Sequence, residues 1–222
     1  MENGLKTHCS VEDFVPLVEF LGAFIGKDCE VVLHDTNNLE RSVVAIANGH
    51  ISGRKIGAPM TDLALKVVKD KQYEETDFVM DYDTVSKEGK SLRSATYFIK
   101  DMNDELQGML CLNMDVTKLV DARDMLTKFL RASGLEKKRR PKKTQKEPER
   151  FHESIEDLTS NMVREVMSEY SVPAERLTPN EKMDIVAELN RRGVFLIKGA
   201  VALVATSLVA SEATIYRYLN KS

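Results

Sequence analysis

The spacing of apolar residues changes from helical to strand-like early in the chain. Between residues 10 and 26 it is helical, and we expect an N-cap at Asp13 or a break near it, because this places Pro16 in the first turn, where a missing N–H costs nothing. From residue 30 onward, runs rich in β-branched residues indicate strands. The expected strands cover residues 30–34, 41–47, 91–100 and 106–114.

Turn and cap signals complete this half of the pattern. Asn48-Gly49 is typical of a type I′ hairpin, so residues 50–52 are expected to form a return strand. Thr61 is placed to cap a helix, and a short strand is expected around residues 78–80. An amphipathic helix over residues 116–132 follows the last strand.

Residues 8–132 therefore read as an α+β domain, with a mainly antiparallel sheet of about five strands and flanking helices. This order of elements is PAS-like, although other α+β folds share it. Residues 133–150 follow as a linker that is almost free of apolar side chains and cannot bury a core. The linker is a solvated spacer or, because it is basic, a source of salt-sensitive affinity for nucleic acid.

Residues 151–222 show only helical periods and predict an all-α domain. Its first helix covers 154–170, and Thr178-Pro-Asn-Glu181 is a capping box with proline at the first helical position. The last two helices lie close together, with Val204, Ala205 and Leu208 on the inner side of one and Ile215 and Leu219 on the other. This spacing predicts a helix-turn-helix, although an ordinary helical hairpin has similar stripes.

The outward side of the last helix favours DNA as the partner. Arginine and asparagine make bidentate contacts to base edges, and serine and threonine suit phosphates or bases. Two features depart from the usual sequence of a DNA-binding helix-turn-helix. Val209 stands where glycine is common, and Glu212 repels phosphate unless it contacts a cytosine. The candidate DNA-binding residues are Ser211, Glu212, Ala213, Thr214, Tyr216, Arg217 and Asn220.

Composition and charge fit this division of the chain. The 222 residues are 42% apolar and 30% charged, with a net charge of −3. The net charge divides into −6 for residues 1–135, +5 for 136–150, −6 for 151–190 and +4 for 191–222. Positive charge thus gathers near the expected DNA reader. No apolar run approaches the ~20 residues that span a bilayer.

Other sequence features bear on location and chemistry. No secretory signal opens the chain, and three scattered cysteines (Cys9, Cys29 and Cys111) indicate a reducing cytoplasm. The sequence contains no phosphate-cradling glycine loop, nucleophile elbow or HExxH motif, so we expect no enzyme and no catalytic residues.

Four polar residues near strand ends or in a glycine-bearing loop could line a ligand cavity in the first domain. More commonly, such residues cap strands and satisfy backbone groups. These candidate ligand-binding residues are His34, Asp35, Arg54 and Asn113. No histidine or cysteine pair has metal-ligand spacing, so we expect no metal site, and the cofactor stays open, with haem as a minor option.

Three segments of the first domain carry a specific resemblance: Val32-Leu-His-Asp35, the stretch 45–54 and Leu110-Cys-Leu-Asn-Met-Asp115. They resemble the YheO-like PAS domain of bacterial transcriptional regulators, a family that includes the D-arginine utilisation repressor. Leu196-Ile-Lys-Gly-Ala-Val201 and residues 213–219 resemble the helix-turn-helix that follows this domain. The resemblance implies a cytoplasmic DNA-binding regulator whose PAS-like domain senses a small molecule or mediates dimerisation.

We therefore expect a homodimer that binds double-stranded operator DNA and is not attached to a membrane. In this mechanism an effector shifts the population of dimer geometries and so changes the spacing of two recognition helices. The alternative is a ligand- or haem-binding PAS sensor that acts through protein–protein contacts.

Overall fold

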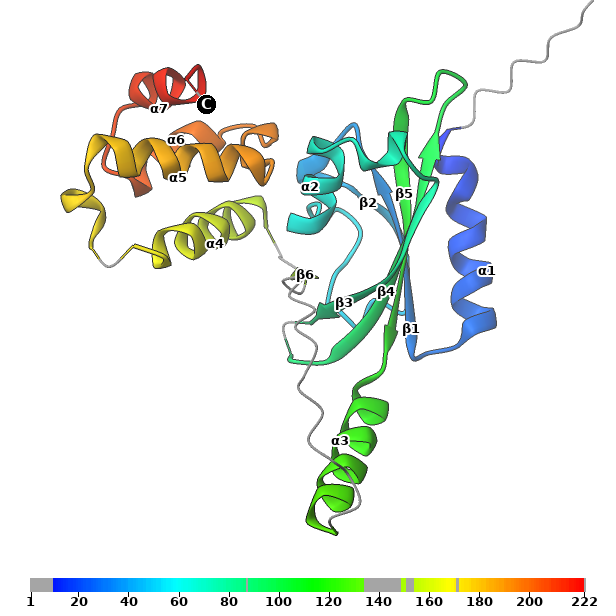
Figure 1. The fold of residues 1–222 in the computed structure, drawn as a ribbon. Helices are drawn as coiled ribbons and strands as arrows, with labels where there is room; N and C mark the ends of the chain where they lie inside the picture. Colours follow the sequence, from blue (N-terminus) through cyan, green and yellow to red (C-terminus); the bar gives the residue numbers. More distant parts are fainter. Residues whose placement is uncertain (1–9, 87, 134–148, 151–153, 171, 222) are drawn as a thin grey trace, which may run out of the picture.

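The computed structural model describes residues 10–86, 88–133, 149–150, 154–170 and 172–221 (Figure 1). It contains a sheet with helices on both faces, followed by a compact group of helices. The fold is α+β, with a mainly antiparallel sheet in the first part and helices carrying the helix-turn-helix in the second, as the sequence predicts.

The described sheet has six strands in the order β2-β1-β5-β4-β3-β6. Five of them pair antiparallel, while β6 runs parallel to β3 at the edge. Leu112 of the central strand pairs with Val31 on one side and Ala95 on the other. The strands are β1 (Cys29–Asp35), β2 (Val43–Ala47), β3 (Phe78–Val85), β4 (Ser91–Lys100), β5 (Leu106–Asp115) and β6 (Glu149–Arg150).

Helix α1 (Val15–Ile25) covers one face of the sheet, over β1 and β2 (Figure 1). Pro16 lies in its first turn, as expected, but Phe14 is the N-cap, so the expected cap at Asp13 is wrong. Ser10 and Asp13 instead form the capping box of a short 3₁₀ helix (Val11–Phe14) that precedes α1. The helix approaches β2 so closely that a Cβ atom on Gly22 would lie 2.4 Å from that of Ala47.

The expected hairpin at Asn48-Gly49 is wrong. Asn48 has a positive φ of 57°, and its side-chain amide lies 2.8–3.2 Å from the carbonyl oxygens of Gly22, Gly26 and Cys29. The amide N–H of Gly53 donates to Gly49 O at 2.9 Å, so the chain coils here instead of returning as a strand. Asn48 thereby ties the end of α1 to β1, and the next strand begins only at Phe78.

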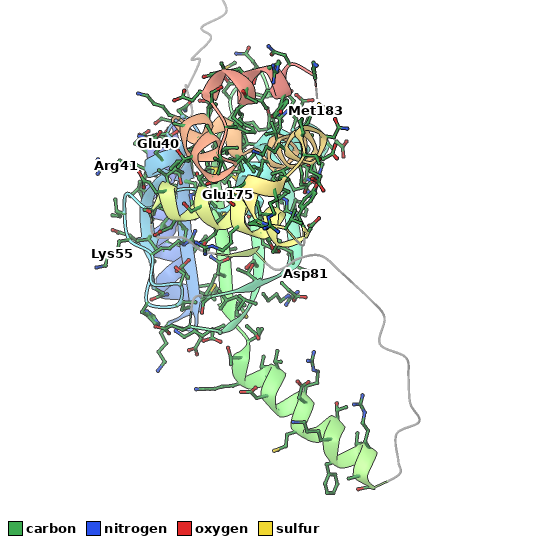
Figure 2. The ribbon with its side chains drawn as sticks, turned by 90° about the vertical axis from the view of Figure 1, so that its left-hand side faces the viewer. Glu40, Arg41, Lys55, Asp81, Glu175 and Met183 are labelled. Carbon is green, nitrogen blue, oxygen red and sulfur yellow. The ribbon has the colours of Figure 1, made fainter. Side chains whose placement is uncertain are left out.

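Two more helices complete the first part. Helix α2 (Asp62–Lys69) lies on the face opposite α1 and is capped by Thr61, as predicted. Helix α3 (Thr117–Ala132) leaves the end of β5 and projects away from the sheet (Figures 1 and 2). Short 3₁₀ helices occupy Leu39–Arg41 and Gln72–Glu74.

The described residues of the second part form four α-helices and two 3₁₀ helices. The capping box at Thr178 and Glu181 starts α5 as the sequence predicts. The apolar stripes meet in one core, with Leu158, Leu189 and Ile215 fully buried. The elements are α4 (Ile155–Ser168), η4 (Ala174–Arg176), α5 (Pro179–Arg191), η5 (Val194–Leu196), α6 (Ala200–Ser207) and α7 (Glu212–Leu219).

Helix α2 lies between the sheet and the second group of helices (Figure 1). Lys69 Nζ lies 3.4 Å from Asn190 Oδ1, and a Cβ on Gly193 would lie 3.0 Å from the carbonyl oxygen of Leu65. Residues 134–148 of the expected linker lie outside the described part, but its last two residues form β6 beside β3 and α2. The two parts of the protein are therefore in contact along α2.

Candidate DNA-reading helix and buried polar site

The turn between α6 and α7 is built from local hydrogen bonds. Val209 has a φ of 48°, in the region that favours glycine, and Ala210 N–H donates to Ala205 O at 2.9 Å. Ser211 caps α7, since its hydroxyl oxygen accepts the N–H of Thr214 at 3.2 Å. The turn therefore directs α7 back across α5 and α6, which both contact it.

Helix α7 has one buried and one exposed side. Ile215 is fully buried and Tyr218 is buried, while Leu219 is half-buried. The guanidinium carbon of Arg217 lies 5.6 Å from the ring centroid of Tyr218, which helps to orient the cation. Of the predicted DNA-binding residues, Thr214 is half-buried and the others are exposed: Ser211, Glu212, Ala213, Tyr216, Arg217 and Asn220.

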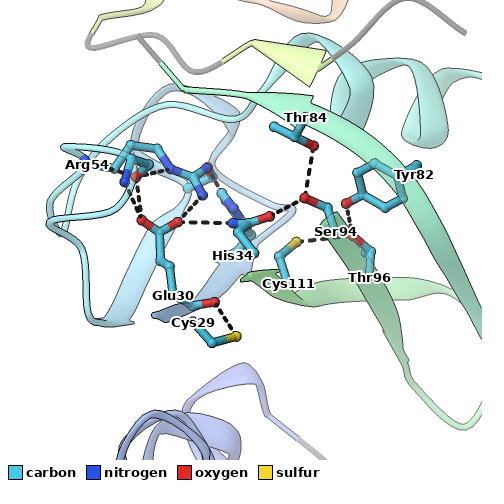
Figure 3. A network of polar contacts seen from close by, with 12 residues as sticks. Cys29, Glu30, His34, Arg54, Tyr82, Thr84, Ser94, Thr96 and Cys111 are labelled. Carbon is cyan, nitrogen blue, oxygen red and sulfur yellow. Dashed lines mark hydrogen bonds and ion pairs between the residues drawn. The ribbon is translucent and has the colours of Figure 1, made fainter. Parts of the chain in front are cut away.

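The face of the sheet beneath α2 carries a buried ion pair. Arg54 Nη2 lies 2.7 Å from Glu30 Oε1, and both side chains are almost completely excluded from solvent (Figure 3). Asn113 Nδ2 donates to the same oxygen at 3.0 Å, and the hydroxyl and N–H of Ser52 donate to Oε2. Several donors on one carboxylate offset the cost of burying its charge.

Hydroxyl groups continue this polar network across β4 to β3. Ser94 Oγ lies 2.8 Å from both Asn113 Oδ1 and Thr84 Oγ1. Farther along the strands, Thr96 Oγ1 lies 2.8 Å from the Tyr82 hydroxyl and 3.3 Å from Cys111 Sγ (Figure 3). The interior of the first domain therefore contains a chain of buried polar side chains that hydrogen-bond to one another.

His34 belongs to the same buried face. Its Nδ1 lies 2.9 Å from Ser42 Oγ, and the residue is 1% exposed. Burial lowers the pKa of His34 to about 3, and the positive charge of Arg54 acts in the same direction. The imidazole is neutral at physiological pH, so it can offer one donor and one acceptor.

The structure brings together three of the four predicted ligand-binding residues. His34, Arg54 and Asn113 all lie in or beside the buried polar network, whereas Asp35 is half-buried and accepts the N–H of Asn37 at 2.8 Å as part of a turn. Sequence reasoning missed Glu30, the centre of the network. The available signal was its alternation with Val32 and His34 on one face of β1.

In the described ranges, histidine, cysteine, aspartate and glutamate side chains form no group of three that could hold a metal ion. His8 and Cys9 lie outside those ranges. None of the described helices is long and apolar enough to cross a membrane.

Both parts of the chain match known domain families. The YheO-like PAS domain model matches residues 5–131, and a helix-turn-helix domain model matches residues 158–220. The chain is 32% identical over 213 residues to an uncharacterized protein of Haemophilus influenzae, covering 95% of this chain and 90% of the relative.

Two further relatives align over nearly the whole chain. YheO of Escherichia coli K12 is 32% identical over 218 residues, covering 95% of this chain and 84% of YheO. The transcriptional regulator DauR of Pseudomonas aeruginosa is 24% identical over 213 residues, covering 96% and 94%. The chain belongs to the family of proteins that join a YheO-like PAS domain to a C-terminal helix-turn-helix domain.

Proposed function

We propose that this DNA-binding transcriptional regulator works in the cytoplasm as a homodimer that reads operator DNA with two copies of α7. The assignment of α7 as the DNA-reading helix rests on its having one buried and one exposed side. Ile215 and Tyr218 hold it in the core, while Arg217 and Asn220 are exposed on its outer side. A recognition helix needs this combination of a fixed inner side and free polar side chains outside.

Each exposed residue suits a particular contact. Arg217 can read guanine and Asn220 can read adenine by paired hydrogen bonds, while Ser211 and Thr214 at the N-terminus of α7 suit phosphate groups. Glu212 fits a cytosine amino group. Two such helices must lie roughly 34 Å apart to reach successive major grooves, which is why we propose a dimer.

For the PAS domain we propose that it senses a small molecule at the buried polar network. A ligand that exchanges hydrogen bonds with His34, Arg54 or Asn113 would alter the packing beneath α2. The other side of α2 contacts the helix-turn-helix domain at Asn190 and Gly193. A ligand that binds two arrangements of α2 with different affinity would thus shift the DNA-binding domain between two positions.

The test is a selection of random double-stranded DNA with the full-length protein at moderate salt. We expect one sequence to be enriched, and Arg217→Ala to weaken binding to it by ~1–3 kcal/mol. The matched control is Arg176→Ala, which removes an exposed arginine of the same domain outside α7 and should leave the affinity unchanged. If no sequence is enriched, the result would favour a protein as the partner of this domain.

A further inference from the structure

Helix α3 has a wide apolar side that the described part of the chain does not cover. None of its 16 residues is buried, and the exposed fractions are 69% for Leu119, 72% for Met125, 57% for Leu126 and 66% for Phe129. The helix stands away from the sheet along its length (Figure 2). A helix of this length is marginal in water without packing, so an occupant of the apolar side would stabilise it.

The spacing of the apolar residues identifies the kind of occupant. Leu119, Ala122, Leu126 and Phe129 are separated by three, four and three residues, which is the a and d spacing of a heptad repeat. On a helix these four positions form one narrow seam, and Met125 and Leu130 widen it. A seam with this period packs against another helix with the same period, and a second copy of α3 supplies it.

The charges of α3 agree with this orientation. They lie mainly on the side opposite the seam, at Asp121, Asp124, Lys128 and Arg131. Pairing along the seam therefore leaves these four charged groups in water and avoids the cost of burying them. Lys118 and Arg123 flank the seam and can keep their cationic ends exposed while their methylene groups cover its edges.

We infer that α3 is the surface along which two copies of this chain associate, with Leu119, Ala122, Leu126 and Phe129 in the contact. The inference rests on the proposed homodimer and assigns its interface. Sixteen residues make a helix about 24 Å long, so the paired seam is smaller than the ~800 Å² per partner of a standard interface. Association along α3 is therefore expected to depend on protein concentration.

The first experiment compares two lysine substitutions by light scattering of the full-length protein over a range of concentrations. Leu126→Lys places a charge in the seam and should give the mass of one chain where the unaltered protein gives that of two. Thr127→Lys is the matched control, since it introduces the same charge at the next residue, outside the seam, and should leave the dimer intact. Both sites lie on a helix without buried side chains, so folding of the sheet should be unaffected.

The outcomes separate the interface from the dimer. If Leu126→Lys remains a dimer, the α3 assignment is overturned while the proposed homodimer stands. If the unaltered protein has the mass of one chain throughout, both fail. Hydrogen exchange of the α3 amides adds a second measurement, in which protection should rise with protein concentration. Protection that does not change with concentration would mean that the same chain covers the seam, or that nothing does, and would also overturn the inference.

Discussion

Gly193 of the helix-turn-helix domain lies against the backbone of Leu65 in α2, so closely that an added Cβ would be 3.0 Å from the Leu65 carbonyl oxygen. Its φ of +80° already favours glycine. The close approach and the positive φ both require glycine at this position, where the two domains meet.

Gly193→Ala should therefore destabilise the protein more than the backbone conformation alone requires. Gly199→Ala is the control, because Gly199 has the same φ of +80° but no atom within 4 Å of the added Cβ. Each change costs about 1–2 kcal/mol for the left-handed conformation, and Gly193→Ala about 1 kcal/mol more for the crowded contact. Chemical denaturation gives the difference, and hydrogen exchange should show loosening of α2 in the Gly193 variant alone. Equal losses would mean that the domains separate at little cost.

The free energy of unfolding should depend strongly on both partners of the buried ion pair between Glu30 and Arg54. Glu30→Gln leaves the guanidinium of Arg54 buried opposite a neutral amide, and it should lower the free energy of unfolding by about 3 kcal/mol. The exposed pair of Lys71 and Glu74 provides the comparison, since Glu74→Gln breaks an ion pair in water and should leave the stability almost unchanged. The double change Glu30→Gln with Arg54→Met should recover part of the loss, and no recovery would contradict an uncompensated charge as its cause.

His34 predicts a loss of stability in mild acid. Its pKa is about 3 in the folded protein, whereas an unfolded chain binds the proton near pH 6.5. The unfolded state therefore holds more protons below pH 6.5, and the free energy of unfolding falls by about 2 kcal/mol between pH 6.5 and 5. His34→Gln should flatten this slope, and the same change at exposed His50 should keep it. A slope that survives in the His34 variant would locate the proton uptake elsewhere.

Replacing Val209 with glycine should make the protein more stable. It is β-branched, 57% exposed and held at a φ of 48°, a conformation that costs such residues of the order of 1–3 kcal/mol. Val209→Gly removes this strain at an entropic cost of about 0.5–1 kcal/mol, so the net effect should range from neutral to stabilising by about 2 kcal/mol. The melting temperature is the measurement. A lower value would show that the Val209 side chain packs favourably in the turn.

Local sequence signals predicted the second domain well and the interior of the first only in part. The caps at Thr178 and Ser211 and the stripes around Leu208 and Ile215 are short-range features, and the structure confirms them. The Asn48-Gly49 prediction failed because Asn48 is held by three carbonyl groups that are 19 to 26 residues away. Local pattern contains no information about such partners.

The same reason explains the other differences. Glu30 is buried because Arg54, Ser52 and Asn113 surround it, and only the tertiary fold brings them together. The parallel pairing of β6 with β3 joins Thr84 to Glu149 across much of the sequence. The contact of Gly193 with Leu65 is equally remote.

Strand β6 also bears on how the protein can be divided for experiments. A fragment ending at residue 133 would lack the two residues that pair with Thr84 and Val85, leaving the whole edge of β3 unpaired. Exposed Phe78 and Met80 lie on the same strand, and open edges with apolar neighbours promote strand-to-strand aggregation. A fragment extended through residue 150 would retain these two pairs, but both fragments would also lose the contact of α2 with the second group of helices.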